Sequence, residues 1–351
     1  MKTNLLLAGA LLATGIFTAN AQTNLATTTI TSRGLEAGTL GTGSTFFGYQ
    51  TGKVNTSTGT SNTFVGQLSG NNNTTGSQNT CLGHSSGRTN IAGNRNTYLG
   101  TFAASDLSAG NDNVIIGYSA NETYDATANQ NVVIGALSYA MGSNNLSLGY
   151  NSRATGTNNV VLGHSAGLAT SGSNNIILGY QAAMNTNIGN SRLWIENSSA
   201  AVPLIWGDFS TDQLKFNGKV GIGLNAANYP TTAASVNVSN YKLIVNGGIL
   251  STEVRIAAYA NWADYVFEKD YRLKPLSEVE AFIKENGHLP NVPAADEIAA
   301  KGFEMGEMAK IQQEKIEELT LYAIQQQKQL DQQQKEIEEL KAIVKQLAAK
   351  Q

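Results

Sequence analysis

The sequence predicts a mainly β protein with a helical C-terminus: a parallel β-roll or β-solenoid head, a short β shaft, a small helical cap module and a coiled-coil stalk. Three observations lead to this fold class. A glycine recurs nine times at spacings of 14 to 18 residues, short β-patterned segments follow the last repeat, and a seven-residue apolar pattern runs towards the C-terminus. The corresponding domains are residues 38–190, 191–258, 259–305 and 306–351.

Residues 1–21 have the features of a signal peptide. Lys2 precedes an apolar run from Leu5 to Phe17, and Ala19, Asn20 and Ala21 form a small-x-small site. We therefore expect export, to the extracellular space or the cell surface rather than the periplasm. No later stretch reaches about 18 consecutive apolar residues, so no integral membrane span is expected.

Each repeat reads G-x-x-N-x-Φ-Φ-G, where Φ is hydrophobic in most repeats and the last glycine is called the turn glycine. The turn glycines are Gly48, Gly66, Gly83, Gly100, Gly117, Gly135, Gly149, Gly163 and Gly179. The three residues before each one are expected to form a strand, which alternates its side chains between two faces. The third strand position is aliphatic in every repeat except the first. We therefore expect this position to be buried when the rungs stack.

Glycine and asparagine are expected at the corners, because both residues tolerate positive φ. The first strand position changes from threonine in the early repeats to aliphatic residues in the later ones, which we interpret as a packing face. Cys81 holds a middle strand position and is interpreted as a small packed hydrophobe.

The position after the turn glycine is occupied by tyrosine or histidine in six of the nine repeats. These residues are Tyr49, His84, Tyr118, Tyr150, His164 and Tyr180. One interpretation is an exposed aromatic ladder that binds a ligand by stacking on sugars, and the other is side-chain stacking between rungs or chains. The residues alone leave both open.

Residues 191–258 contain short β-patterned segments, which are too few for a core of their own and are expected to pair with equivalents from sister chains. The module that follows contains one helix with Ser277 as N-cap, Glu280 completing a capping box and Gly287 as its end. A second short helix is expected to run to Gly302.

The last helix is expected to start near Gly306 and to form a coiled coil. Its a and d positions are apolar in eight of ten cases, with Gln326 and Gln333 as the exceptions. The apolar positions, predicted to mediate oligomerisation, are Ile316, Leu319, Ala323, Leu330, Ile337, Leu340, Val344 and Leu347. This pattern alone does not decide between two and three strands.

The repeats GTNNVVLGHSAG (156–167) and GSNNIILGYQAA (172–183) resemble the head repeats of trimeric autotransporter adhesins. That resemblance implies a left-handed parallel β-roll in which three chains pack side by side, and the expected homotrimer rests on it. The segment WADYVFEKDYRLKPLSEVEAFIKENGHLPNVPAADEIAAKGFEMGEM (262–308) is similar to the C-terminal module of tail-fibre-domain proteins from Bacteroidetes-type bacteria. It implies a folding and trimerising cap.

No pattern of residues indicates catalysis. Only three histidines occur, and no nucleophile elbow or phosphate-binding loop is present. We therefore expect no enzyme activity, no cofactor and no metal site. A net charge of -3 gives no basic footprint for nucleic acid. The expected function is a trimeric surface fibre, an adhesin or tail-fibre-like protein, attaching through its head to glycans or a host or cell surface. The alternative is a purely structural filament or spacer without specific ligand binding.

Overall fold

The computed structural model describes residues 30–122, 128–225, 229–233, 236–256 and 262–349. The predicted signal peptide, residues 1–21, lies outside this part of the chain. The chain divides into two compact units, Met1–Gly218 and Lys219–Gln351. Each unit is described by itself below.

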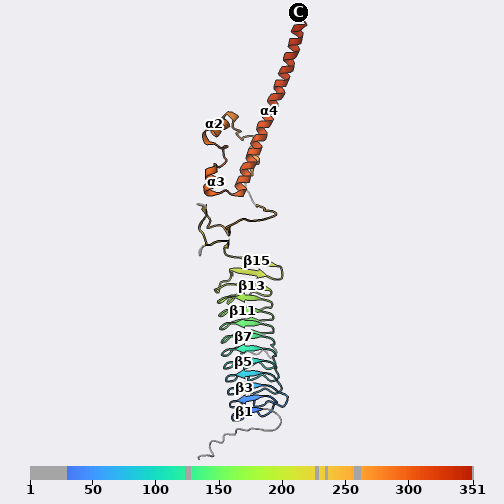
Figure 1. Ribbon diagram of the computed structural model, residues 1–351. Helices are drawn as coiled ribbons and strands as arrows, with labels where there is room; N and C mark the ends of the chain where they lie inside the picture. The colour runs from blue at the N-terminus through green and yellow to red at the C-terminus, as the bar shows by residue number, and fades with distance from the viewer. Residues whose placement is uncertain (1–29, 123–127, 226–228, 234–235, 257–261, 350–351) are drawn as a thin grey trace, which may run out of the picture. The chain divides into compact units, whose positions relative to one another are not determined.

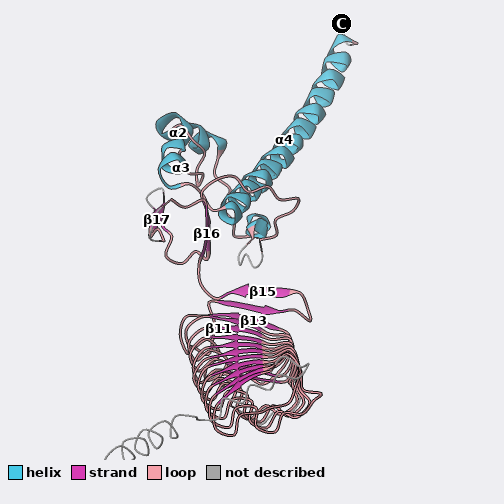
Figure 2. Ribbon diagram, turned by 60° about the horizontal axis from the view of Figure 1, so that its bottom comes forward, coloured by secondary structure: helices cyan, strands magenta, loops and turns pink. Residues whose placement is uncertain are grey.

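The first unit is a parallel β-solenoid, as the glycine period predicted (Figures 1 and 2). Its main sheet contains β1 (Thr31–Arg33), β2 (Thr45–Phe47), β3 (Thr63–Val65), β4 (Thr80–Leu82), β5 (Thr97–Leu99), β6 (Val114–Ile116), β7 (Val132–Ile134), β9 (Leu146–Leu148), β11 (Val160–Leu162), β12 (Ile176–Leu178) and β13 (Arg192–Ile195). Each strand pairs in parallel with the next, in the register set by the repeat. Where the repeat shortens to 14 residues, β8 (Tyr139–Met141) and β10 (Arg153–Thr155) add a second small parallel sheet.

The core of the solenoid contains a column of middle strand positions, which packs against buried alanine and leucine side chains of the turns such as Ala104 and Leu107. Phe46, Phe64, Tyr98, Ile115 and Val133 are all fully buried there, and Cys81 shares the column at 1% exposure. The prediction that the third position is buried was therefore wrong. Leu82, at the third position of β4, is 45% exposed. Alternation along a strand separates two faces, but it does not tell which face turns inward. In this chain both faces are largely apolar.

The turn glycines are required by the close approach of neighbouring rungs. Gly100 has a φ of +133°, and a Cβ built on it would lie 2.4 Å from the carbonyl oxygen of Gly117 in the next rung. The expectation that the repeat asparagines also take positive φ was wrong. The residue before each of them does so instead, for example Gln78 at 60° and Arg95 at 56°. The asparagines form a hydrogen-bonded ladder, described below.

The parallel sheet extends past both predicted limits of the head, residues 38 and 190. It begins with β1, and β13 still pairs in parallel with β12. The antiparallel strands β14 (Ile205–Asp208) and β15 (Gln213–Phe216) then end the sheet and belong to the same unit. The C-terminal unit begins with two small sheets, β16 (Val220–Ile222) with β19 (Leu243–Val245) and β17 (Thr232–Ala233) with β18 (Val236–Asn237).

The C-terminal unit also contains η1 (Ala263–Phe267), α2 (Leu276–Asn286), α3 (Ala295–Lys301) and the 44-residue α4 (Met305–Ala348). Gly287 ends α2 in the left-handed conformation, as predicted. The predicted N-cap at Ser277 was wrong, because the helix already starts at Leu276. Pro275 precedes it with a φ of -56° and makes no side-chain cap. Within the described residues, no helix has the length and apolar character that crossing a membrane requires.

Candidate interaction surfaces

The residues that the structure describes contain no group of three or more His, Cys, Asp or Glu side chains arranged for a metal ion. Cys81 is buried, and burial raises the pKa of its thiol, so the sulfur stays protonated and out of reach of solvent. Five surface features stand out as places where a partner could bind: one sheet face, two aromatic groups, the α4 helix and a groove beside it.

The outer sheet face consists of the first and third strand positions, which point away from the solenoid core. Its third positions are apolar and half exposed, as in Leu99 at 39%, Ile134 at 38% and Leu178 at 42%. Its first positions change from threonine in β2 to β5 to valine, leucine or isoleucine in the later main-sheet strands β6, β7, β9, β11 and β12. No charged side chain interrupts these columns between Thr45 and Leu178. A continuous uncharged strip of this kind is typical of an interface.

Five of the six predicted ladder residues fall into two separate groups. Tyr150, His164 and Tyr180 form one stack, with ring centroids 5.0 and 5.3 Å apart and interplanar angles of 27° and 33°. His84 and Tyr118 belong to rungs that are separated by one other rung. They are joined by Phe102, whose ring lies edge-on to both, at 5.1 and 6.3 Å.

The sixth residue, Tyr49, is 41% exposed. Phe102 was not in the prediction, because it stands two residues after its turn glycine rather than one.

The geometry of the ring contacts bears on whether these side chains could bind a sugar. In the first stack the ring of His164 lies between those of Tyr150 and Tyr180, stacked on the first and tilted against the second. Sugars stack on ring faces, and the side chains of Tyr150 and Tyr180 are each 48% exposed. The observed contacts are those expected of side-chain stacking between rungs.

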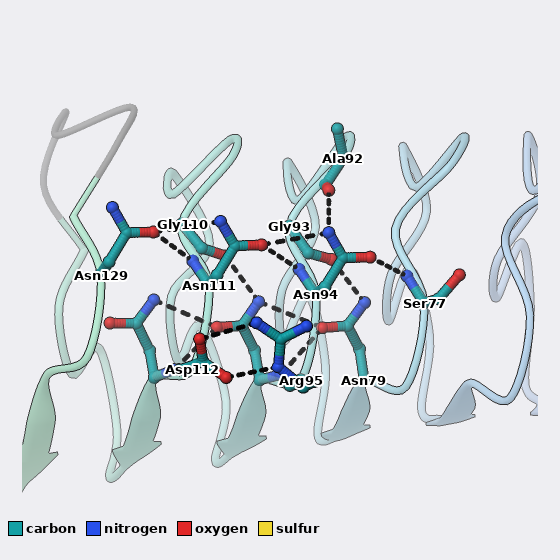
Figure 3. Close-up of polar contacts among 12 residues, drawn as sticks. Ser77, Asn79, Ala92, Gly93, Asn94, Arg95, Gly110, Asn111, Asp112 and Asn129 are labelled. Carbon is teal, nitrogen blue, oxygen red and sulfur yellow. Dashed lines mark hydrogen bonds and ion pairs between the residues drawn. The ribbon is translucent and has the colours of Figure 1, made fainter.

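Two asparagine ladders hold adjacent rungs together (Figure 3). In the inner ladder, the backbone N–H of Asn96 donates to Oδ1 of Asn79 in the preceding rung at 3.0 Å, and its side-chain amide donates to the carbonyl of Gly110 at 2.7 Å. In the outer ladder the hydrogen bonds run in the opposite direction along the solenoid. The N–H of Asn94 donates to Oδ1 of Asn111 in the following rung at 2.9 Å.

These bonds satisfy backbone donors that the turns leave without a strand partner. Beside the ladders, Arg95 forms a bidentate ion pair with Asp112, one rung further on. Every rung is thus tied to its neighbours by side chains as well as by the sheet. The polar groups of the two ladders are engaged in hydrogen bonds that hold the fold.

The heptad positions of α4 are exposed in the single chain. The exposed fractions are 56% for Ile316, 65% for Leu319, 51% for Leu330, 45% for Ile337, 61% for Leu340, 63% for Val344 and 62% for Leu347, and Ala323 is also exposed. All described side chains from residue 323 onwards are exposed. A helix of this length gains most of its stability from packing of its apolar side.

The N-terminal part of α4 is held to the cap module by a charged cluster. Lys315 Nζ lies 2.7 Å from carboxylate oxygens of both Glu314 and Glu318. The hydroxyl groups of Tyr265 and Tyr271 donate to the same two carboxylates. The hydrogen bond to Glu314 raises the pKa of Tyr265 to about 12, because the neutral phenol is the donor.

A groove with a volume of about 370 Å³ lies beside this cluster. Its apolar lining comes from Leu276, Val279, Leu289 and Pro290 on one side and from Leu319 of α4 on the other. Sequence patterns did not predict the groove, because it is formed by segments that meet only in the folded module. Leu319 is the one residue that was predicted, as a heptad position.

No protein-family model matches the chain, and a search of curated proteins finds no similar sequence.

Proposed function

We propose that this chain is a non-catalytic, homotrimeric fibre, exported to the cell surface or the extracellular space, that mediates attachment through its solenoid head. The observation that carries the proposal is the outer sheet face. The core of the solenoid is already filled by the middle strand positions and by buried turn residues. Even so, the outward third positions are apolar in every repeat, and the outward first positions are apolar from the repeat of β6 onwards. A second set of apolar side chains on the outside of a closed core calls for a partner.

The size of this face fits an interface between copies. The nine repeats supply two outward side chains each, and at about 60 Å² apiece they would bury about 1,100 Å² per chain, above the roughly 800 Å² per partner of a standard interface. The exposed heptad positions of α4 are a second surface of the same kind. The resemblance of the repeats to trimeric adhesin heads favours three copies over two.

The oligomeric part of the proposal is tested by the mass of the mature protein in light scattering. A mass three times that of the chain is expected. A monomer at micromolar concentration would refute the trimer.

The attachment part is tested with a variant that lacks residues 30–218. This variant should remain oligomeric through α4 but lose binding to cell surfaces and to a glycan array. The full mature protein is the matched control, and heat-denatured protein sets the background.

A second candidate, a structural spacer without a specific ligand, is favoured by the aromatic stacks. Tyr150, His164 and Tyr180 contact one another across successive rungs, so these rings already have a role in holding the rungs together. If the variant without residues 30–218 attaches as well as the full protein, the spacer describes this chain better than the adhesin.

A further inference from the structure

The cap module leaves an apolar groove open along α4. Neither α2 nor α3 contains a buried residue. Leu276 at the start of α2 is 61% exposed, and Leu289 after it is 42% exposed. Both line the groove, together with Leu319 and Tyr322 of α4. The module therefore presents apolar side chains that its own chain does not cover.

The groove adjoins the predicted helix–helix interface. Leu319 belongs both to the groove and to the d positions of the heptad pattern. With Ile316 at position a, Lys315 and Tyr322 occupy g positions, so the groove lies on the g side of α4. In a parallel coiled coil, the g side of one helix meets the e side of the next helix.

The e side of α4 presents an apolar residue outside the heptad interface. Thr320 stands at position e, and Ile324, one turn further on, stands at the adjoining b position. Position b is normally polar in a coiled coil, because it faces solvent. The Ile324 side chain is 47% exposed in the single chain.

Ile324 and the groove lie at the same level along the axis of α4. In a rotationally symmetric, parallel assembly, identical residues lie at the same level along the axis. Ile324 stands two residues beyond Tyr322, which is about 3 Å along the helix. At Tyr322 the groove joins a second hollow lined by Gln325, Gln326 and Gln329. Ile324 of a neighbouring copy is therefore level with the junction of the two hollows.

We propose that Ile324 of a neighbouring copy enters the groove formed by Leu276, Leu289, Leu319 and Tyr322, so that each cap module is completed in trans. This inference rests on the homo-oligomer proposed above and adds the contact that joins module to neighbouring stalk. Within one chain the contact is impossible. Ile324 follows Lys315 by nine residues and so points to the opposite side of α4, about 180° away.

Disulfide trapping tests the contact in the full mature protein. Chains carrying Leu276→Cys and chains carrying Ile324→Cys are made with tags of different size, co-expressed and oxidised. The native Cys81 is buried and is therefore not expected to form disulfides with the introduced cysteines. A mixed dimer is expected on a non-reducing gel. The matched control replaces Ile324→Cys by Asp331→Cys, which occupies the same b position one heptad, or about 10 Å, further along.

The outcomes separate this inference from the proposed function. A trimeric mass with no mixed dimer, or with equal trapping at Asp331→Cys, overturns the groove contact and leaves the trimer standing. A monomeric mass for the protein without substitutions overturns both.

A second measurement covers the case in which a cysteine variant fails to assemble. In the otherwise unaltered trimer, Ile324→Ala should speed amide hydrogen exchange in α2 about tenfold, whereas Asp331→Ala should leave it unchanged. Equal exchange rates in both variants would overturn the groove contact.

Discussion

Alanine substitution of Ile115 and of Ile116 separates the two faces of one strand. The two residues are adjacent in β6 and chemically identical. Ile115 is fully buried between Tyr98 and Val133 of the neighbouring rungs, whereas Ile116 is half buried on the outer sheet face. The same substitution at both positions therefore measures which face carries the core.

The expected cost at Ile115 follows from its burial. Removing three carbon atoms loses about 2.4 kcal/mol of transfer free energy, at about 0.8 kcal/mol per methylene. A residual cavity of about 75 Å³, at about 24 cal/mol per Å³, adds about 1.8 kcal/mol. We therefore expect Ile115→Ala to lower the free energy of unfolding by about 4 kcal/mol. For Ile116→Ala, which leaves no cavity, we expect about 1 kcal/mol within the chain.

The measurement is amide hydrogen exchange of the mature protein, read over peptides that span residues 98–134. A solenoid is stabilised by contacts between neighbouring rungs, so the lost protection should centre on β5 to β7. Light scattering of the same samples reports any loss of association at Ile116→Ala. Equal loss of protection in the two variants, or a larger loss at Ile116→Ala, would refute the assignment of the buried face.

Three further predictions concern single contacts. Gly100→Ala should destabilise the solenoid by more than about 3 kcal/mol in chemical denaturation. The added Cβ would lie 2.4 Å from the carbonyl oxygen of Gly117, and the φ of this position is +133°. A change below about 1 kcal/mol would contradict the close approach. Asn96→Ala should cost about 2 kcal/mol in the same assay, because the buried N–H of Asn113 loses its acceptor; no loss would mean that water replaces the amide. Asp208→Asn should remove an acid-sensitive step in thermal unfolding.

Asp208 should stabilise the fold at neutral pH and lose this effect in acid. Hydrogen bonds from Ser210, with the charge of Arg192 2.6 Å away, hold the pKa of Asp208 below its usual range. The stabilisation is therefore present above the ordinary aspartate pKa of about 3.9 and is lost as the pH falls through the lowered folded value. Below about pH 4 the melting temperature of the end of the solenoid should fall in the native protein. If Asp208→Asn melts with the same pH dependence, another carboxylate is responsible.

Several features of the fold were readable from local patterns. The turn glycines marked the corner that follows each main-sheet strand of the nine repeats, because only glycine can pass so close to the carbonyl of the next rung, as at Gly100. The end of α2 at Gly287 was predicted for a similar local reason, the left-handed conformation. The start of α2 was predicted wrongly. The capping signal pointed to Ser277, but the helix begins earlier, directly after Pro275.

The candidate surfaces were predicted less completely. The stacking of Tyr150, His164 and Tyr180 followed from the repeat, since equal positions in stacked rungs lie close together. Phe102 was missed because its ring joins His84 and Tyr118 from a different position of the repeat. The groove beside α4 was missed because Leu276 and Leu319 are far apart in the sequence and share no common pattern.

The sequence by itself determined that this protein stacks short strands into a solenoid and ends in a long amphipathic helix. Periodic glycines and a heptad pattern are local and repeat along the chain, so they can be read without a structure. Only the tertiary structure decided which face of each strand is inside, and hence that an apolar face is left outside. A three-residue strand such as Val114–Ile116 is apolar on both faces, and the path of the turns chooses between them.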